Sequence, residues 1–346
     1  WWSFEIALIS KKIDIMNKVI TLKERPSGKP EEKNFEFKKE EKPALEDGEI
    51  LLESKYISVD PYLRGRMRDE DSYITPFKLN EPLSSMVVAK IVESKNDEFQ
   101  EGDHVSGMLQ WKQFQKHTGE DLNKITNKKV PLSAYLGILG LTGLTAYLAL
   151  KNIGKLKEGE TLLVSGAAGA VGSVVGQIGK IKGCRVVGIA GTDEKIDHIK
   201  SDFGFDAGIN YKTTGDMAKA IKEHCPDGVD VYFDNVGGEI LDAAMQNIND
   251  FARIINCGAI SIYNKEEVPK GMRLEGIMVK KRALMQGFIV RDHADEFQEA
   301  IKQLGSWLAD DKLKFDETRR EGFENVPKAF IEIFEGKNTG KMLVEV

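Results

Sequence analysis

The stretch TLLVSGAAGAVGSVVGQIGKIKGCRVVGIAGTDEK, residues 161–195, decides the fold. Its pattern predicts a buried strand, a glycine-rich turn, a helix and a second apolar strand. Ala167, Gly169 and Gly172 follow an A-x-G-x-x-G pattern in which alanine replaces the usual first glycine. Gly169 lets the backbone approach a pyrophosphate, and Gly172 and Gly176 let the helix pack on the sheet. A tight turn without a ligand is the alternative, but this strand–turn–helix–strand order favours a dinucleotide site at the helix N-terminus.

The end of the second strand indicates which dinucleotide binds. An NAD enzyme usually places Asp or Glu there to bind the ribose hydroxyls. Here residues 190–192 are small and uncharged, Asp193 lies beyond the strand end, and Lys195 follows in the next helix. A cation at this place favours a 2′-phosphate, so we expect NADP(H). A solvated helix lysine is the alternative interpretation of Lys195.

Strands and helices alternate around this stretch, from about residue 133 to residue 305. This spacing predicts βαβ units and a doubly wound parallel sheet of the Rossmann type, an α/β fold. Residues 134–154 are small and apolar and predict one long helix. Residues 16–132 read as short strands separated by Pro and Gly, which is typical of a mostly β, partly open barrel. Residues 306–346 revert to that pattern, so the nucleotide-binding domain is expected to be an insertion in the substrate domain.

Length, charge and composition limit the function classes. A chain of 346 residues with 41% apolar side chains is long enough for two domains with buried cores. No apolar run approaches the ~18 residues that a membrane span needs. The net charge of −6 comes from scattered charges of both signs, which argues against a nucleic-acid partner. Residues 1–15 precede a plausible start at Met16 and are expected to be an expression or annotation extension.

The cysteine and histidine pattern argues against a metal site and for a cytoplasmic protein. The three cysteines lie far apart without CxxC spacing, as reduced cytosolic thiols do. Three are too few for a four-cysteine zinc lobe, and the five histidines are isolated. We therefore expect no metal.

Several motifs occur in order, and together the chain resembles the zinc-free medium-chain dehydrogenase/reductases. The resemblance is to the branch of prostaglandin reductases, alkenal double-bond reductases and curcumin reductases, and it runs from about Val19 to the C-terminus. It implies that the β-rich domain is GroES-like and that the protein is a homodimer joined through its nucleotide-binding domains. The motifs are SVDPYLRGRM (58–67), LGILGLTGLTAY (136–147), AAGAVGSVVGQIGK (167–180), FDNVGG (233–238), CGAISIYN (257–264) and GKNTGK (336–341).

The same resemblance implies the cofactor contacts, from the pyrophosphate and the 2′-phosphate to the nicotinamide half and the returning C-terminal segment. An ordinary strand-end tyrosine remains the alternative for Tyr211, and Cys257 reads as a packed neighbour rather than a reactive thiol. Asp60 and Arg64, four residues apart, are expected to form a structural ion pair, with contacts to the substrate as the alternative. The implied contacts are Gly169, Ala170, Val171, Gly172, Lys195, Tyr211, Asn235, Cys257, Gly258, Ala259, Ile260, Ser261, Tyr263, Phe288, Ile289, Val290 and Asn338.

Without a metal, reduction of a carbon–carbon double bond conjugated to a carbonyl needs the least help from the protein. The protein must hold the reacting carbons and donate a hydrogen bond to the oxygen on which charge collects. Tyr263 is the candidate donor, with a loop tyrosine that only packs the cofactor as the alternative. Tyr62 is a weaker second candidate and could instead be a core or pocket-wall residue. We therefore expect an NADPH-dependent reductase of enones and enals. A quinone reductase and a non-catalytic NADP(H) sensor are the alternatives.

The sequence also suggests what surrounds the substrate. We expect the pocket walls to come from the irregular N-terminal domain and from residues about 265–285. The polar segment 264–283 is interpreted as a mobile flap over the site.

Overall fold

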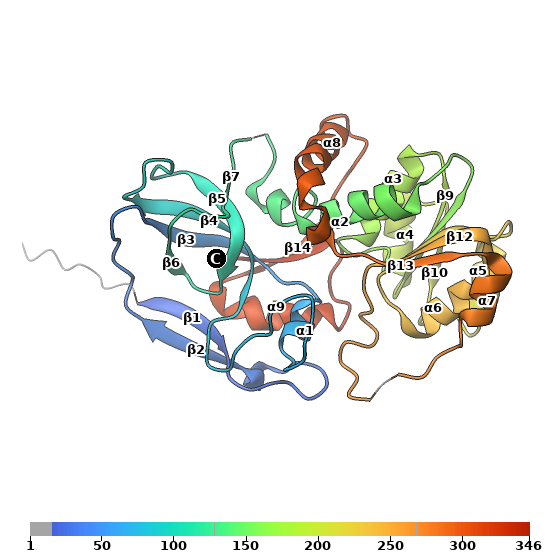
Figure 1. The fold of residues 1–346 in the computed structure, drawn as a ribbon, viewed down its shortest axis with the longest axis horizontal. Coiled ribbons are helices and arrows are strands. Elements are labelled where there is room, and N and C mark those ends of the chain that lie inside the picture. The colour runs from blue at the N-terminus through green and yellow to red at the C-terminus, as the bar shows by residue number, and fades with distance from the viewer. Residues whose placement is uncertain (1–15, 128, 268) are drawn as a thin grey trace, which may run out of the picture.

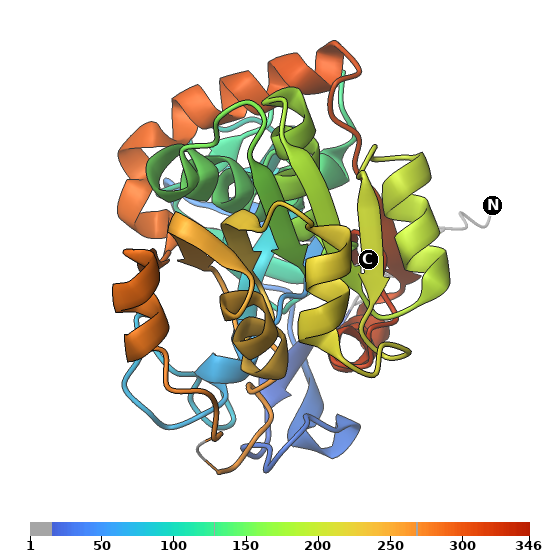
Figure 2. The same cartoon turned by 90° about the vertical axis from the view of Figure 1, so that its right-hand side faces the viewer.

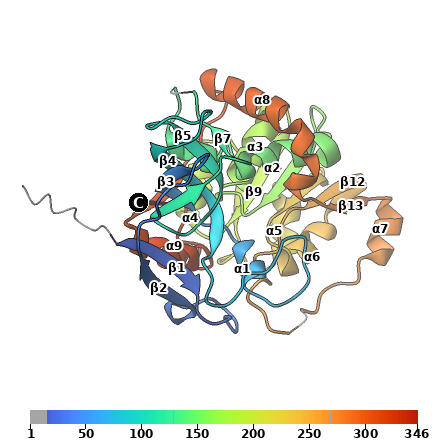
Figure 3. The same cartoon turned by 60° about the vertical axis from the view of Figure 1, so that its left-hand side comes forward.

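The computed structural model describes residues 16–127, 129–267 and 269–346 and contains two large sheets, one in each part of the molecule, and a two-stranded ribbon of β1 (Asn17–Leu22) and β2 (Phe35–Glu40) (Figure 1). The β1–β2 ribbon of the β-rich part and helix α7 (Glu275–Lys281) lie at opposite ends in two views (Figures 1 and 3). The expected extension, residues 1–15, lies outside the described residues. Within those residues, no helix has the length and apolar character needed to cross a bilayer.

The predicted parallel sheet is confirmed, and it has six strands in the order β10-β9-β8-β11-β12-β13. Chain order reverses beside β8, so the carboxyl ends of β8 and β11 meet at the switch point where such sheets bind ligands. The strands are β8 (Thr161–Ser165), β9 (Arg185–Ala190), β10 (Ala207–Asn210), β11 (Val229–Asp234), β12 (Ile248–Asn256) and β13 (Leu284–Gly287).

Helices cover both faces of this sheet (Figure 2). Leu162 and Val164 of β8 pack into the core that contains α3 and α8, whereas Leu163 between them faces the core that contains α5 and α6. This alternation explains why the three central residues of β8 are all apolar. The helices are α2 (Leu141–Ala149), α3 (Gly172–Ile181), α4 (Asp193–Ser201), α5 (Met217–His224), α6 (Gly238–Met245) and α8 (Phe297–Ala309), with shorter turns η3 (Leu150–Gly154) and η4 (Val290–Glu296).

The single helix expected over residues 134–154 is wrong. A short turn, η2 (Leu132–Leu136), ends before Gly137, and α2 begins only at Leu141. The chain folds back on itself between them, because a Cβ on Gly143 would lie 1.8 Å from the carbonyl oxygen of Ile138. Glycine is therefore required where the helical pattern suggested a continuous turn.

The second sheet has seven strands, and the C-terminal segment supplies two of them. Strand β15 pairs antiparallel with β3 and parallel with β14, so the end of the chain returns to the β-rich part. The path is β14-β15-β3-β4-β5-β7, with β6 beside β3 and a separate β1–β2 ribbon. The elements are β1 (Asn17–Leu22), η1 (Glu32–Asn34), β2 (Phe35–Glu40), β3 (Ile50–Ser58), α1 (Leu63–Arg66), β4 (Ser84–Ser94), β5 (His104–Gln110), β6 (Phe114–His117), β7 (Asn123–Lys124), β14 (Glu317–Glu321), η5 (Phe323–Asn325), α9 (Val326–Ile333) and β15 (Lys341–Glu345).

Candidate active site

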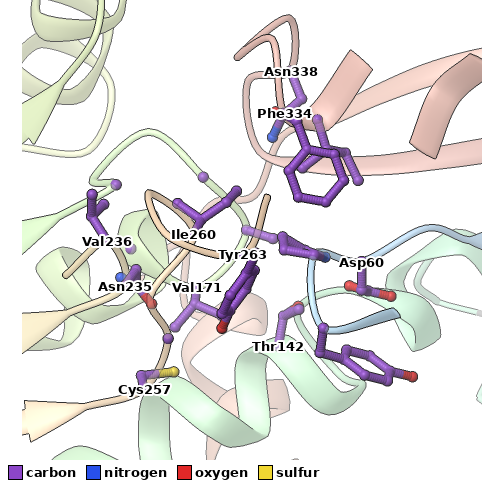
Figure 4. Close-up of a pocket in the computed structure, with 18 of the residues that line it drawn as sticks. Asp60, Thr142, Val171, Asn235, Val236, Cys257, Ile260, Tyr263, Phe334 and Asn338 are labelled. Atoms are coloured by element: carbon purple, nitrogen blue, oxygen red, sulfur yellow. The ribbon is translucent and has the colours of Figure 1, made fainter. Parts of the chain in front are cut away.

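A cavity of about 870 Å³ opens where the carboxyl ends of the parallel strands face the β-rich part, and Figure 4 shows side chains that line it. Of the residues proposed from sequence, only Ala259 is absent from its lining. The cavity brings together Tyr62, Gly169, Ala170, Val171, Gly172, Lys195, Tyr211, Asn235, Cys257, Gly258, Ile260, Ser261, Tyr263, Phe288, Ile289, Val290 and Asn338.

The turn between β8 and α3 lines the middle of the cavity. Gly166 adopts a φ of +61°, which favours glycine, and a Cβ on Gly172 would lie 2.3 Å from the Gly166 carbonyl oxygen. The turn therefore closes tightly on the first turn of the helix, whose N–H groups have no partner within the helix. The sequence motif places its first glycine at Ala167, but Gly166, one residue earlier, makes the tight turn.

A buried carboxylate, Asp234 at the end of β11, organises the neighbouring loop. It accepts hydrogen bonds from the Ser165 hydroxyl at 2.9 Å and the Tyr232 hydroxyl at 2.8 Å. The amides of Val236 and Gly237 donate to the same oxygen at 3.0 and 2.9 Å. Four donors compensate the burial of this charge and hold the loops after β8 and β11 together. The sequence interpretation missed Asp234, although an acid at the end of an apolar strand is a visible signal.

Asn235 spans the same two strands. Its side-chain amide donates to the Ser165 carbonyl at 2.8 Å and its backbone amide to the Ser165 hydroxyl at 2.9 Å. Asn235 lines the cavity beside Val236 and Cys257 (Figure 4). Its position is thus set by the protein itself before any ligand is considered.

Tyr263 enters the cavity from the loop after β12, between the side chains of Asn235 and Asp60 in Figure 4. The Ala259 amide donates to its hydroxyl oxygen at 3.1 Å. Ala259 is thus connected to the cavity through Tyr263, although it does not line it. Burial raises the pKa of the Tyr263 phenol, so the hydroxyl keeps its hydrogen at neutral pH.

Tyr62, at the start of α1, lies on the opposite side of the cavity. Its hydroxyl is buried and has no hydrogen-bond partner in the part of the chain that the structure describes. Burial, reinforced by the nearby Asp60 carboxylate, raises the pKa of this phenol. A buried hydroxyl without a partner costs about 1–3 kcal/mol, so this group is available for a ligand.

The far end of the cavity carries Lys195 and Tyr211. Thr192 caps α4, and the Lys195 ammonium donates to the Gly336 carbonyl at 2.6 Å. Burial, with a contribution from Lys212, lowers the pKa of Lys195. A Cβ on Gly191 would lie 3.0 Å from the Tyr211 ring, so a larger acidic side chain would crowd it there.

The C-terminal segment closes the cavity between the two parts. Gly340 donates its amide to the Ala168 carbonyl at 2.8 Å, and the Asn338 side chain donates to the Gly340 carbonyl at 2.9 Å. This places the returning segment against the turn that precedes α3. Asn338 lies beside Phe334 at the edge of the cavity (Figure 4).

The ion pair expected between Asp60 and Arg64 is wrong. Asp60 pairs with the buried Lys341 ammonium at 3.0 Å, and Arg64 donates to the carbonyls of Pro26 and Gly28 at 3.0 to 3.2 Å. The two residues occupy the turn into α1, where spacing by four does not bring the side chains together.

Cys257 and Phe288 form an apolar wall. Burial, with a contribution from Asp234, raises the pKa of the Cys257 thiol to about 12, which agrees with a packed rather than a reactive cysteine. Phe288 is buried and stacks on His293 with ring centroids 5.0 Å apart.

The pocket walls expected from residues 265–285 are largely wrong, since among the described residues of that range only Lys265 lines the cavity. Residues 275–281 form α7, which packs on β12, so the flap interpretation fails for that portion. The N-terminal part does line the cavity, as expected, and contributes Tyr73 and Ile74 from the loop after α1. The walls that the sequence did not identify come from α2, η4 and the end of α9: Thr142, Thr145, Arg291, Ile333 and Phe334. Within residues 16–127, 129–267 and 269–346, no group of three or more His, Cys, Asp or Glu could hold a metal ion.

Sequence profiles of known families match both parts of the chain. Residues 18–125 match the family described as the N-terminal domain of oxidoreductase. Residues 170–306 match the family described as zinc-binding dehydrogenase.

Individual proteins match nearly the whole chain. A Bacillus subtilis (strain 168) protein, provisionally named NADP-dependent oxidoreductase YfmJ, is 54% identical over 94% of this chain and 97% of its own. The NADPH-dependent curcumin reductase of Escherichia coli (strain K12) is 41% identical over 95% of this chain and 97% of its own. The crystal structure of CurA from Vibrio vulnificus in complex with NADPH superposes with a TM-score of 0.91 at 41% identity, covering 95% of this chain and 99% of that one.

Proposed function

Because this chain belongs to the zinc-independent medium-chain dehydrogenase/reductases, in the branch of prostaglandin, alkenal and curcumin reductases, we propose that it reduces conjugated carbon–carbon double bonds with NADPH. The substrates are α,β-unsaturated ketones and aldehydes. One observation carries the proposal at the level of residues. A single cavity is lined both by the glycine turn before α3 and by the Tyr263 phenol, whose oxygen already accepts a backbone hydrogen bond.

The lining of the cavity fits NADPH. At one end Lys195 supplies a cation and the neighbouring strand end carries no acid, which suits a 2′-phosphate. In the middle, Gly169 and Gly172 line the cavity at the N-terminus of α3, whose N–H groups suit the pyrophosphate. At the other end Cys257 and Phe288 offer an apolar wall for the nicotinamide half. We assign these residues, with Tyr211, Asn235 and Asn338, to holding the cofactor.

The chain's own residues then activate the substrate. When bound, NADPH supplies the hydride that the β-carbon of the substrate receives. Tyr263 donates a hydrogen bond to the carbonyl oxygen on which negative charge collects, and a proton from water then reaches the α-carbon to give the saturated product. A hydrogen bond of this kind is worth about 2.7–4 kcal/mol of barrier. Tyr62, whose hydroxyl lacks a partner among the described residues, is the second donor that faces the substrate.

We further propose that the protein is a cytoplasmic homodimer. The cysteines Cys184, Cys225 and Cys257 are all free, as thiols in a reducing compartment are. Strand β13 is an edge of the parallel sheet, and its residue Leu284 is exposed. Val279, on the preceding helix α7, is exposed as well. Pairing through this edge would cover both apolar side chains. Sedimentation of the purified chain tests the stoichiometry.

The decisive experiment measures NADPH oxidation, as loss of its absorbance, with a small enone, a small enal and a simple quinone, and repeats each with NADH. We expect turnover of the enone and enal with NADPH and little with NADH. Product analysis must show the saturated ketone rather than the allylic alcohol. Consumption of the quinone alone, or binding of NADPH without any turnover, would overturn the proposal.

A further inference from the structure

An arginine of the β-rich part reaches across to the loop that carries Tyr263. Arg68 follows α1, and its Nη2 atom donates to the backbone carbonyl oxygens of Tyr263 at 3.0 Å and of Lys265 at 2.9 Å. The residues are 195 and 197 positions apart in sequence, so the contact joins the two parts of the molecule. The Arg68 side chain is 32% exposed, which shields these hydrogen bonds partly from water.

We propose that Arg68 is a positioning residue that holds Tyr263 in place for catalysis. It does not line the cavity and does not touch the reacting atoms; it acts on the backbone on which the phenol is mounted. The inference rests on the proposed function, in which the Tyr263 hydroxyl donates to the substrate carbonyl. According to this inference, the position of that hydroxyl depends on the β-rich part as well as on the nucleotide-binding part.

The loop around Tyr263 has separate anchors at its two ends. On the side towards β12, the Ser261 amide and hydroxyl both donate to the Val236 carbonyl, at 3.1 and 2.6 Å, within the nucleotide-binding part. On the far side, Arg68 holds residues 263 and 265, and the Ser27 hydroxyl donates to Glu266. Tyr263 therefore lies between one anchor from each part of the molecule.

The second anchor favours an arginine for a physical reason. One planar guanidinium nitrogen has two hydrogens in fixed directions, and here each meets a different carbonyl oxygen. The nearest carboxylate recorded for Arg68 is Glu70, at 3.7 Å and on an exposed side chain, so the two carbonyls are its closer partners. Loss of this contact frees the loop to shift, and a displacement of about 1 Å at a catalytic group costs up to about 100-fold in rate.

The test uses the full chain with the variants Arg68→Met and Arg68→Lys. Arg185→Met is the matched control, because that guanidinium also donates twice to one backbone carbonyl, that of His224, on the surface away from the cavity. We expect Arg68→Met to lower kcat for an enone about 10- to 100-fold with KM changed less than about 3-fold. Arg68→Lys keeps a cation but loses the fixed directions of the guanidinium hydrogens, so we expect it to restore only part of kcat, and Arg185→Met resembles the parent.

A double-mutant cycle separates positioning from general damage. If Arg68 acts through Tyr263, Arg68→Met combined with Tyr263→Phe is no slower than Tyr263→Phe alone. Amide hydrogen exchange on the cofactor-free protein gives a second readout, with faster exchange across residues 259–266 in Arg68→Met and unchanged exchange in the core strands. Additive rate losses, or unchanged exchange in this loop, overturn the inference. An undiminished rate in Tyr263→Phe overturns instead the catalytic role proposed for Tyr263, and the exchange result then still tests whether Arg68 holds the loop.

Discussion

The Tyr263 hydroxyl oxygen and the Ala259 amide nitrogen lie 3.1 Å apart, with the amide as donor. Because the phenol oxygen accepts this bond, its own hydrogen is free to be donated. Gly258, the residue before Ala259, leaves room for this oxygen, since a Cβ there would lie 3.2 Å from it. Tyr263 is therefore a donor whose geometry is set before substrate enters.

Replacing Tyr263 by Phe removes this donor while the ring still fills its place. We expect turnover of an enone to fall at least about 100-fold, because the charge on the carbonyl oxygen loses its hydrogen bond. NADPH affinity, measured by fluorescence titration, should change little. Unchanged turnover would remove Tyr263 from the mechanism.

The raised pKa of Tyr263 determines how activity depends on pH. The protonated phenol is the active form, so activity is complete below its pKa and is lost as pH rises through it. Burial moves that pKa above its ordinary value of about 10. We therefore expect kcat to be flat between about pH 6 and 9 as far as this group is concerned, and to fall above about pH 10. Tyr263→Phe should lack the alkaline fall, whereas an identical fall in both proteins would assign it to another group.

Tyr62→Phe should affect stability and substrate binding in opposite directions. The Tyr62 hydroxyl is buried without a partner among the described residues, so its removal relieves a penalty of about 1–3 kcal/mol and raises the melting temperature. If the hydroxyl donates to the substrate, KM for an enone rises in the same variant. Thermal unfolding of the cofactor-free protein and steady-state kinetics measure the two effects. A lower melting temperature would mean that the hydroxyl has a structural partner.

Periodicity and composition predicted the parallel sheet, because the middle of β8 is apolar and the strand is buried on both faces. The motif assigned the tight turn to Ala167, one residue after Gly166, which makes it. The pattern identifies a turn but not which residue takes the left-handed conformation that Gly166 adopts. The chain reversal before α2 was missed for a related reason. Only the close approach of Gly143 to Ile138 shows that the backbone bends there.

Contacts that join distant parts of the chain could not be predicted from spacing. The pair of Asp60 and Arg64 was expected from a helical rule, but Asp60 finds Lys341, which lies 281 residues further along the chain. The prediction that residues 265–285 form cavity walls was wrong for the same reason, since polar composition does not say which side chains face a ligand. The resemblance to known reductases supplied Tyr263 and Asn338, whereas Arg68 and Asp234 emerged only from the hydrogen bonds of the folded chain.

Lys195→Gln tests the choice of cofactor. The ammonium is expected to bind the 2′-phosphate, and a hydrogen bond to a charged group contributes about 1.5–3 kcal/mol. We therefore expect the Kd of NADPH to rise about 10- to 100-fold while that of NADH changes little. Lys200→Gln on the exposed face of the same helix is the control. Equal losses for NADPH and NADH would show that Lys195 supports the fold of the site rather than the 2′-phosphate.

Lys341→Met tests the buried ion pair that joins the C-terminal strand to the turn before α1. The Lys341 side chain is only 4% exposed; its ammonium meets Asp60 at 3.0 Å and donates to the Val59 carbonyl at 2.9 Å. Its removal leaves Asp60, whose side chain is 13% exposed at the cavity wall, without its cation, which costs up to about 3–5 kcal/mol of folding free energy.

Urea unfolding of four proteins separates this cost from lost packing. We expect Lys341→Met to be strongly destabilised and the double variant Asp60→Asn/Lys341→Met to recover part of the loss, because the uncompensated charge is then gone. The control is Lys116→Met, which breaks an exposed pair with Glu49 and should cost far less. If Lys341→Met costs no more than Lys116→Met, water in the cavity that Asp60 lines compensates its carboxylate in place of the ammonium. Gly340, the residue before Lys341, donates its amide to the Ala168 carbonyl in the turn before α3. If NADPH binding restores part of the stability lost in Lys341→Met, the ion pair also holds the cofactor site together.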